Sequence, residues 1–472
     1  MQIKSIFETA KDSTNRLHPL PVQKQLCREE IRSGKRRLVS TIHINPSCTF
    51  QHIDGFGGAL TESAGYVLSL IPKEKRKEAL AACFSAEEGI GYTLARTHLN
   101  SCDFSLENWA CIEHPDESLD SFSMERPDTY ITPLIQEAQD LVKSNCAKDS
   151  LKLMVSPWSP PAWMKDNGKM NNGGILLKKY YPLWAEYFVR YIDELTKRGI
   201  ETWAVTVQNE PRSVQTWDSC IWTPAEEGEF AVKHLGPVLE KYSQTSGKRI
   251  KIYVTDHNRD NLQNFFTESM SVPGADKYID GAAFHWYSGD QYENVAKVAE
   301  GFPKKDIVFT EGCVEGGPYP QAWFTGERYA HNIINDLNHG CTGCIDWNIA
   351  LDMQGGPNHV KNFCDAPILV DTDKGTIHYN SSYYYIGHFS RFIRPQARRI
   401  DFTVTSYNNP VTIDGYTGNM MECCTFKNTD GSVVLVIMNR TEADMAYEFF
   451  IGNESASIMC PPRGIQTVVI DV

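Results

Sequence analysis

Short apolar runs that end in polar side chains recur along most of the chain. Residues 203–211 (WAVTVQNEP) begin with Trp, Ala, Val and Thr and end abruptly in Gln208, Asn209 and Glu210. Such a run is typical of a strand buried on both faces, as in a parallel sheet covered by helices. We expect eight strand ends of this kind, at 54–58, 91–98, 153–156, 203–209, 252–256, 282–286, 307–311 and 344–348.

Amphipathic stretches separate these strands. The clearest is 177–198, where Trp184, Phe188, Tyr191 and Leu195 recur at helical spacing. Another helix is expected over 61–84, with Thr61 as its N-cap. Alternating strands and helices over residues 51–394 predict an α/β fold, a (β/α)8 TIM barrel with insertions.

The pattern changes after residue 394. Short strand-like runs follow at 402–407, 420–426, 432–438, 446–451 and 467–472, separated by turn signals such as 408–410 (NNP). Residues 395–472 therefore predict an attached all-β sandwich. A single sheet of this size leaves one face exposed. We therefore expect the N-terminal segment, residues 1–50, to add the alternating stretch at 38–48 to the sandwich. We also expect the sandwich to pack on the barrel.

Composition excludes some classes of partner. The net charge is −13 and the only notable basic run is 35–37 (KRR), which argues against a nucleic-acid partner. No stretch approaches the ~20 apolar residues of a membrane span, so no integral membrane segment is expected. The amino terminus lacks an apolar signal and the 14 cysteines form no regular framework. These features favour a cytoplasmic enzyme, with a removed signal as the alternative.

Two short motifs raise the question of a cofactor. Cys341 and Cys344 form a CTGC that suits a redox pair or half a metal site, but no second CxxC or paired histidines accompany it. Structural thiols are the favoured interpretation, and no metal is expected. The GFGG at 55–58 lacks the spacing of a nucleotide-binding turn, so we expect no cofactor there. Its glycines suit a strand that leaves space for a ligand.

Two glutamates stand out as candidate chemistry. Glu210 ends the run at 203–211, and Glu311 ends a second run at 306–313 (DIVFTEGC). Either one alone suits a surface or capping carboxylate. Together, at the carboxyl mouth of a barrel, they suit a pair in which one group gives a proton and the other attacks.

Several motifs, in order along the whole chain, resemble glycoside hydrolase family 30, and within it the glucosylceramidase type. They are FGGALTESA at 56–64, EEGIGY at 87–92, SCDFS at 101–105, SPWSPPAWMK at 156–165, WAVTVQNEP, HWY at 285–287, TEGC at 310–313 and DWNIALDMQGGPNHVKNF at 346–363. The resemblance implies a retaining β-glycosidase on a (β/α)8 barrel.

The resemblance also implies roles for particular residues. Glu210 resembles the acid/base and Glu311 the nucleophile, while Asn209 resembles the donor to the sugar 2-hydroxyl, or else forms the turn before Pro211. The residues that resemble the rest of the sugar site are Asp103, Trp158, Tyr287, Trp347 and Asn362. The alternative for the two tryptophans is a place in the hydrophobic core. Arg96 and His285 are expected behind Glu311, where Arg96 alternatively forms a structural ion pair.

Three function classes follow. The first is an exo-acting β-glucosidase or glucosylceramidase, the second a relative that cleaves β-xylosides, β-fucosides or β-1,6-glucan, and the third a non-catalytic carbohydrate-binding protein. The expected partner is a small glycoside or glycolipid, and the oligomeric state is left open. Aromatic residues at 319–324, Trp323 among them, are candidates to contact an apolar aglycone. Thr97, His98 and Asn100 depart from the apolar or small residues of the lysosomal relatives, so the floor of the sugar site need not be the same.

Overall fold

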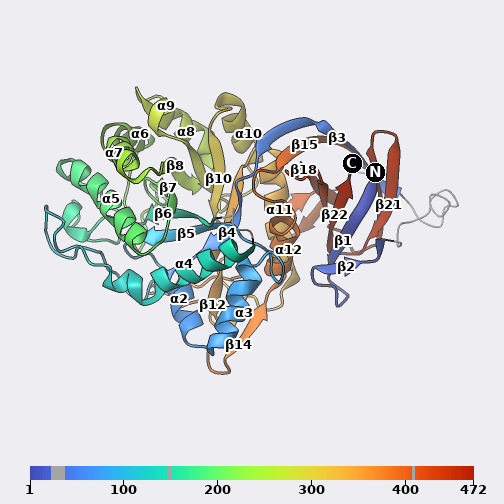
Figure 1. Ribbon diagram of the computed structural model, residues 1–472, viewed down its shortest axis with the longest axis horizontal. Helices are drawn as coiled ribbons and strands as arrows, with labels where there is room; N and C mark the ends of the chain where they lie inside the picture. Colours follow the sequence, from blue (N-terminus) through green and yellow to red (C-terminus); the bar gives the residue numbers. More distant parts are fainter. Residues whose placement is uncertain (23–37, 146–149, 407–409) are drawn as a thin grey trace.

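The computed structural model describes residues 1–22, 38–145, 150–406 and 410–472, and shows a barrel lobe beside a sandwich lobe (Figure 1). The basic run at 35–37 and residues 408–409 of the expected turn lie outside the described residues. Among the residues described, no helix is both long and apolar enough to cross a membrane.

Eight parallel strands close into a barrel in the order β10-β11-β4-β5-β6-β7-β8-β9, so the predicted TIM barrel is confirmed. The strands are β4 (Gly55–Ala59), β5 (Leu94–Leu99), β6 (Lys152–Pro157), β7 (Thr202–Thr206), β8 (Lys251–Asn258), β9 (Gly281–His285), β10 (Asp306–Glu311) and β11 (Gly343–Asn348). Side chains fill the interior, including those of Leu94, Met154, Tyr253 and Val308. The barrel is therefore a packed core whose chemistry is confined to its ends.

Helices surround the barrel. They are α2 (Glu62–Ser69), α3 (Lys73–Phe84), α4 (Glu125–Asn145), α5 (Tyr181–Lys197), α6 (Pro224–Phe230), α7 (Gly236–Ser246), α8 (Leu262–Met270), α9 (Ala275–Tyr278), α10 (Tyr292–Gly301), α11 (Trp323–Asn338) and α12 (Ser381–Ser390). Short 3-10 helices are η2 (Ala162–Met164), η3 (Lys178–Tyr180) and η5 (Arg259–Asn261), and the π-helix η4 (Ala231–Leu235) joins α6 to α7. The single helix expected over 61–84 is wrong, because the chain breaks at Leu70 and restarts after Pro72. Proline lacks an N–H and disfavours helical backbone in the residue before it. Thr61 does cap α2, accepting from Ala64 N at 3.2 Å.

The glycines of β4 serve packing within the protein. A Cβ at Gly57 would lie 1.9 Å from Leu94 O, and one at Gly58 would lie 2.7 Å from the Ile349 side chain. The space expected for a ligand is occupied by the neighbouring strand and by the chain after β11. The prediction that these glycines make room for a ligand is therefore wrong.

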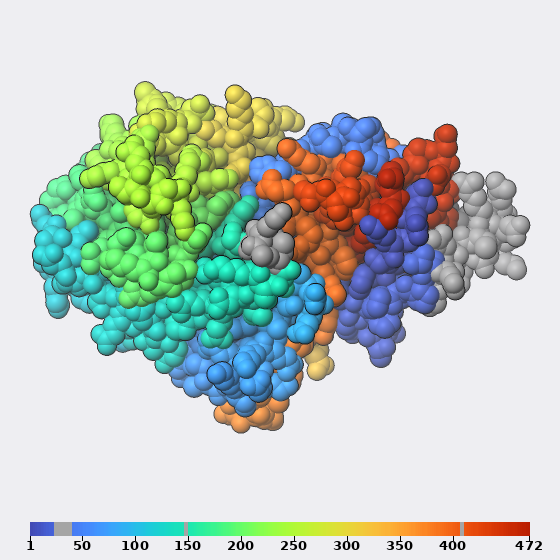
Figure 2. Space-filling model, in the orientation of Figure 1, coloured from blue at the N-terminus to red at the C-terminus, as the bar shows by residue number. Residues whose placement is uncertain are grey.

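The sandwich is one nine-stranded sheet, folded so that its apolar side chains form a separate core. In order, its strands are β2 (His18–Leu20), β1 (Gln2–Ala10), β22 (Gly464–Asp471), β19 (Val433–Asn439), β18 (Met421–Lys427), β15 (Arg398–Ser406), β3 (Leu38–His52), β20 (Met445–Ile451) and β21 (Glu454–Cys460). Segments from both ends of the chain thus share one lobe (Figure 2). Smaller sheets are formed by β12 (Ala350–Asp352), β13 (Ile368–Asp371) and β14 (Thr376–Tyr379), and by β16 (Val411–Ile413) and β17 (Tyr416–Gly418).

Helices α11 and α12 lie between barrel and sandwich (Figure 1). Trp323 belongs to this junction: its Nε1 donates to Arg463 O at 2.8 Å and its ring packs edge-on against Tyr385. Arg463 is in turn paired with Glu327 of α11. A role for Trp323 in contacting an aglycone is therefore wrong, because its ring and its donor already pack against the sandwich.

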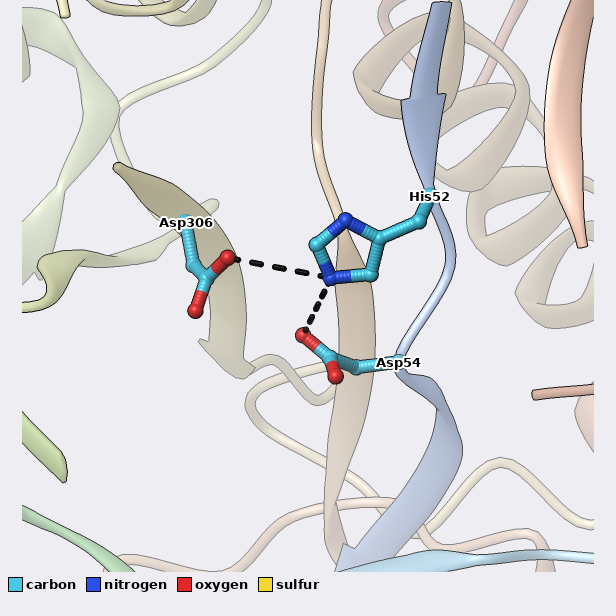
Figure 3. A group of neighbouring side chains, drawn as sticks. All are labelled: His52, Asp54 and Asp306. Atoms are coloured by element: carbon cyan, nitrogen blue, oxygen red, sulfur yellow. Dashed lines mark ion pairs between the residues drawn. The ribbon is translucent and has the colours of Figure 1, made fainter. Parts of the chain in front are cut away.

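A charged cluster closes the amino-terminal end of the barrel, which we call the underside cluster: His52, Asp54, Lys152, Lys251 and Asp306. His52 Nε2 lies 3.6 Å from Asp54 Oδ2 and 3.8 Å from Asp306 Oδ1 (Figure 3). The other oxygen of each carboxylate receives a lysine, Lys152 at 2.5 Å and Lys251 at 2.5 Å. Two lysines balance two carboxylates, so the cluster needs no added cation to be neutral.

Candidate active site

The carboxyl ends of the strands bring Glu210 and Glu311 to one cleft. After β7 the backbone turns, and Glu210 adopts a left-handed conformation, φ 44°, with its N–H donating to Asp256 O at 2.9 Å. Asn209 N donates to Pro157 O at 2.8 Å. Backbone strain of this kind persists where neighbouring contacts fix it, and here it directs the Glu210 side chain inward.

Asp256 is brought inward by an irregular strand end. Thr255 and Asp256 both have positive φ, 76° and 37°, and the register of β8 against β9 shifts between Thr255 and His257. A bulge re-aims side chains next to it. The fully buried Asp256 carboxylate then accepts from Thr206 at 2.7 Å and from Thr310 at 2.6 Å. The sequence analysis did not name this residue.

Glu311 ends β10 and accepts two direct hydrogen bonds. Arg96 Nη1 donates to its Oε2 at 2.7 Å and the Tyr287 hydroxyl donates to its Oε1 at 3.1 Å. The Glu311 side chain is only 9% exposed. Two donors, one of them charged, favour the ionised carboxylate of this residue.

Arg96 links the groups around the cleft. Its fully buried guanidinium also donates to Asn209 Oδ1 and to Asp256 Oδ2, each at 2.8 Å. It lies 4.7 Å from the ring centre of Trp158. Burial lowers its pKa, but Asp256 and Glu311 raise it by more, so the group stays charged. Arg96 thus forms an ion pair and also holds Asn209 in place.

His285 contacts both glutamates. Its Nε2 lies 3.1 Å from Asp256 Oδ1, and its Nδ1 lies 3.5 Å from Glu210 Oε1 and 4.0 Å from Glu311 Oε1. Burial lowers the pKa of His285, but the charge of Glu311 and hydrogen bonds to Asp256 and Glu210 raise it to about 9. The ring is therefore an imidazolium at neutral pH, and it places positive charge between the carboxylates.

The two glutamates titrate as a pair. Burial raises the pKa of Glu311, and it stays raised although His285 and Arg96 lower it. Burial also raises the pKa of Glu210, but the hydrogen bond and charge of His285 lower it by more. Taken alone, the raised pKa of Glu311 and the lowered pKa of Glu210 would place the proton that the pair shares on Glu311. Arg96 and Tyr287 each donate to a different oxygen of Glu311, so both oxygens act as acceptors, and this places the negative charge on Glu311 and the shared proton on Glu210.

Aromatic rings and amides line the rest of the cleft. Trp158 and Trp347 stack with their ring centres 5.3 Å apart. Beside them Asp103 accepts from Asn358 at 3.0 Å and from Asn362 at 3.4 Å. Burial and the charge of Glu311 raise the pKa of Asp103 to about 8. Apolar faces beside groups that donate and accept suit the C–H faces and hydroxyls of a sugar.

Eight of the ten predicted site residues line this cleft of about 280 Å³: Asp103, Trp158, Asn209, Glu210, Tyr287, Glu311, Trp347 and Asn362. Arg96 and His285 lie behind the glutamates. The cleft also contains residues that the sequence analysis did not name: Phe104, Ser213, Gln215, Trp217, Asn258, Cys313, Glu315 and Cys364. For Ser213, Gln215 and Glu315 the available signal was a polar side chain within five residues of Glu210 or Glu311.

The residues that depart from the relatives at 97–100 do not line the cleft, and a separate hollow lies at the other end of the barrel. Thr97 donates to Leu60 O at 2.9 Å and His98 Nε2 accepts from Glu62 N at 3.0 Å, so both side chains are committed to the barrel wall. Asn100 Oδ1 accepts from Tyr187 at 2.6 Å. A larger hollow of about 760 Å³ lies at the underside cluster, where Asp306 is paired with Lys251. We place the candidate site at the smaller cleft, where the paired glutamates lie.

Similarity to known proteins shows to which family a chain with this site belongs. The family model described as "Glycosyl hydrolase family 30 TIM-barrel domain" matches residues 53–393, and the model described as "Glycosyl hydrolase family 30 beta sandwich domain" matches residues 396–468. The chain belongs to glycosyl hydrolase family 30. This confirms the resemblance found in the sequence and makes the protein a glycoside hydrolase.

The proteins similar to this chain carry names that describe different activities or none. The lysosomal acid glucosylceramidase of Mus musculus is 32% identical over 85% of this chain and 78% of its own length. The crystal structure of SrfJ from Salmonella typhimurium has a TM-score of 0.88 and 34% identity, covering 99% of both chains. An endo-β1,6-glucanase structure, BT3312, has a TM-score of 0.83 and 28% identity, covering 98% of both chains.

Proposed function

We propose that this family 30 member is a retaining exo-β-glycosidase that hydrolyses terminal β-glucosides through a covalent glycosyl-enzyme. The observation that carries the proposal is the pair of glutamates in one cleft, Glu210 after β7 and Glu311 at the end of β10, which lie 3.5 and 4.0 Å from His285 Nδ1. Retaining glycosidases use two carboxyl groups about 5 Å apart, one as acid/base and one as nucleophile. A carbohydrate-binding protein has no need of such a pair.

The hydrogen bonds support Glu311 as the nucleophile. Arg96 and Tyr287 hold its carboxylate ionised, so it is ready to attack the anomeric carbon. As the C–O bond to the leaving group breaks, the electron pair goes to the glycosidic oxygen, which takes a proton from Glu210. A proton on Glu210 also balances the charges, because the cations Arg96 and His285 then face the anions Asp256 and Glu311.

The second half of the reaction reverses these roles. Ionised Glu210 removes a proton from water as the water oxygen bonds to the anomeric carbon, and the electron pair of the sugar–Glu311 bond returns to Glu311. Asn209 is held by Arg96 beside both glutamates, a position that suits donation to the sugar 2-hydroxyl. Asp103 and the stacked tryptophans are placed to bind the remaining hydroxyls and the ring face.

The size of the cleft supports attack at a chain end. About 280 Å³ lies at the lower end of the range for small-molecule sites, which suits one terminal sugar better than the interior of a long glucan. Internal cleavage of β-1,6-glucan is the second candidate, favoured by the likeness to the endo-β1,6-glucanase structure. Glucosylceramide is a third substrate to test, given the glucosylceramidase relatives.

A substrate screen tests the proposal. Chromogenic β-glucoside, β-xyloside and β-fucoside would be compared, followed by gentio-oligosaccharides, long β-1,6-glucan and glucosylceramide. We expect preferred turnover of the β-glucoside, release of monosaccharide from the non-reducing end, and the β-anomer as first product in proton NMR. The α-anomer as first product rules out the retaining mechanism, and oligosaccharides released from inside a glucan rule out exo action.

A further inference from the structure

Asp218 is a buried carboxylate that the proposed mechanism does not use. It lies in the loop after β7, next to Trp217, which lines the cleft, and its own side chain is 0% exposed. Asp218 does not line the cleft itself. Burying a carboxylate is unfavourable unless other groups pair with it, so the position of Asp218 depends on its partners.

One oxygen of Asp218 is held by the loop that carries Asp103. Ser101 Oγ donates to Asp218 Oδ1 at 2.5 Å, and Asn108 Nδ2 donates to the same oxygen at 2.9 Å. Ser101 is fixed in turn, because its Oγ accepts from Trp109 N at 3.0 Å and its N–H donates to Trp109 O at 2.9 Å. Asp103 lies two positions after Ser101. Asp218 thus holds the loop after β5 on both sides of Asp103.

The other oxygen of Asp218 faces the loop after β11. His359 Nε2 lies 3.3 Å from Asp218 Oδ2, and the His359 side chain is 7% exposed. The backbone N–H of His359 donates to Asp103 O at 3.1 Å. His359 therefore contacts Asp218 through its ring and Asp103 through its backbone. Loops from three barrel strands, β5, β7 and β11, meet at this pair.

The contacts of Asp103 show what the pair supports. Asn358 and Asn362, from the same loop as His359, both donate to Asp103 Oδ2. Of the residues that the structure describes, none donates to Asp103 Oδ1. Asp103 lines the cleft, so Oδ1 is the oxygen left to bond a sugar hydroxyl. Its direction depends on how the loops after β5 and β11 are held together.

We propose that Asp218 and His359 are positioning residues for Asp103, and that their pairing holds the Asp103 carboxyl group where it binds a hydroxyl of the terminal sugar. This inference rests on the proposed function. Neither side chain lines the cleft, so both act on the sugar through Asp103. A binding group keeps its productive geometry only when contacts behind it fix its orientation.

Two single variants break the pair from opposite sides. His359→Phe keeps an aromatic ring but has no ring nitrogen. In Asp218→Asn the amide oxygen can still accept from Ser101 and Asn108, whereas the NH2 that faces His359 cannot accept from it. Calorimetry with 1-deoxynojirimycin, an iminosugar with the hydroxyls of glucose, is expected to show Kd raised about threefold to tenfold in each variant. The double variant should add little, because both changes remove one contact.

Kinetics separate this role from one at Glu210. On an alkyl β-glucoside the slow first step makes KM approach the dissociation constant, so KM should rise by the same factor while kcat stays within about twofold of wild type. The loss in kcat/KM should be equal for alkyl and dinitrophenyl β-glucosides, because proton donation is untouched. A loss that grows with poorer leaving groups would place the effect on Glu210 and overturn the proposal.

A second buried pair of the same kind supplies the control. Glu422 Oε2 lies 2.8 Å from His331 Nδ1, where α11 meets the sandwich, and both side chains are buried. Glu422→Gln is expected to lower Tm and to leave the iminosugar Kd and KM unchanged. Thermal unfolding of every variant shows whether it is folded.

The outcomes of these measurements are distinct. Weaker iminosugar binding in both folded single variants, with little further loss in the double variant, supports the proposal. Wild-type Kd and KM in folded variants whose Tm alone is lower would give the pair a structural role only and overturn it. If the wild-type chain neither binds the iminosugar nor cleaves a β-glucoside, the proposed function fails, and the inference built on it fails with it.

Discussion

Both ends of the barrel hold carboxylates and cations, yet only the carboxyl end forms a reactive site. At the underside cluster each aspartate has its own lysine at 2.5 Å, and both lysine side chains are 24% exposed. At the carboxyl end Arg96 and His285, both fully buried, are shared among Asp256, Glu210 and Glu311. Three carboxyl groups and two cations leave one proton to be placed, and that proton is what acid/base chemistry uses.

The pKa values of the carboxyl groups also differ between the two ends of the barrel. Burial raises the pKa of Asp54, but His52, Lys152 and Lys251 lower it to about 2, so the group is simply ionised over the physiological range. At the other end, burial outweighs the cations at Glu311, and the pKa of Asp103 rises to about 8. Complete pairing removes titration from the working pH range, whereas shared cations bring it into that range.

The largest effect is expected for Glu311→Ala. Loss of the nucleophile removes the covalent step, so kcat is expected to fall at least about 10³-fold, the scale on which removing a covalent nucleophile acts. Azide fits the space left by the carboxylate and should restore part of the rate, giving an α-glycosyl azide that NMR identifies. Activity close to wild type in this variant would take the nucleophile away from Glu311.

Glu210→Gln is expected to have an effect that depends on the leaving group. Alkyl or sugar aglycones need a proton, so their glycosylation rates should fall about 10²–10⁴-fold. Single-turnover measurements on dinitrophenyl glycosides, which need none, should show little loss in that first step. Equal losses in glycosylation on both classes would contradict the acid/base assignment.

Asp54→Asn is expected to change stability and leave catalysis in place. The folded pKa of Asp54 is lowered to about 2, below the ordinary value of 3.8, so its contribution is present above about pH 4 and lost as pH falls towards 2. The variant should lose about 2 kcal/mol of unfolding free energy at pH 7 and show a flatter decline below pH 4. Urea titrations at several pH values measure both, and a large fall in kcat would show that the underside affects the site.

Removal of divalent metal is expected to have the smallest effect of all. The His52, Asp54 and Asp306 atoms lie within 4.8 Å of one another, which is close enough to suggest a metal site. Lys152 and Lys251 already balance the carboxylates, so EDTA should leave both Tm and activity unchanged. A Tm that falls on chelation and returns with Zn²⁺ would show that the underside cluster binds metal.

Periodicity was sufficient for the barrel and for much of the sandwich. Each barrel strand is a buried run that ends in polar residues, a pattern that survives in the sequence because both faces of the sheet are covered. The break at Pro72 and the strand β21, which carries Ser455 and Ser457 among its apolar residues, were not predicted. In these places a single proline, or polar residues within a strand, gave a weaker signal than the surrounding apolar pattern.

The candidate site was predicted less completely, for a physical reason. Arg96 and Glu311 are 215 positions apart, so no local spacing relates them, and resemblance was needed to place them together. Asp256 and Gln215 were missed because their positions depend on a bulge and on a loop held by Ser219. Backbone irregularities of this kind leave little trace in hydrophobic periodicity.

The pairing of β1 with β22 has a consequence for synthesis of the chain. β1 precedes the barrel in the chain and β22 follows it, and the two pair from Gln2 to Ala10 against Asp471 to Gly464. A ribosome therefore releases the barrel segment long before the sheet beside it can close. Any product that stops short of β22 keeps one side of β1 unpaired, which is the kind of edge that promotes aggregation and exposes a chain to proteolysis. Closure of the sandwich thus has to wait until the whole barrel segment has been translated.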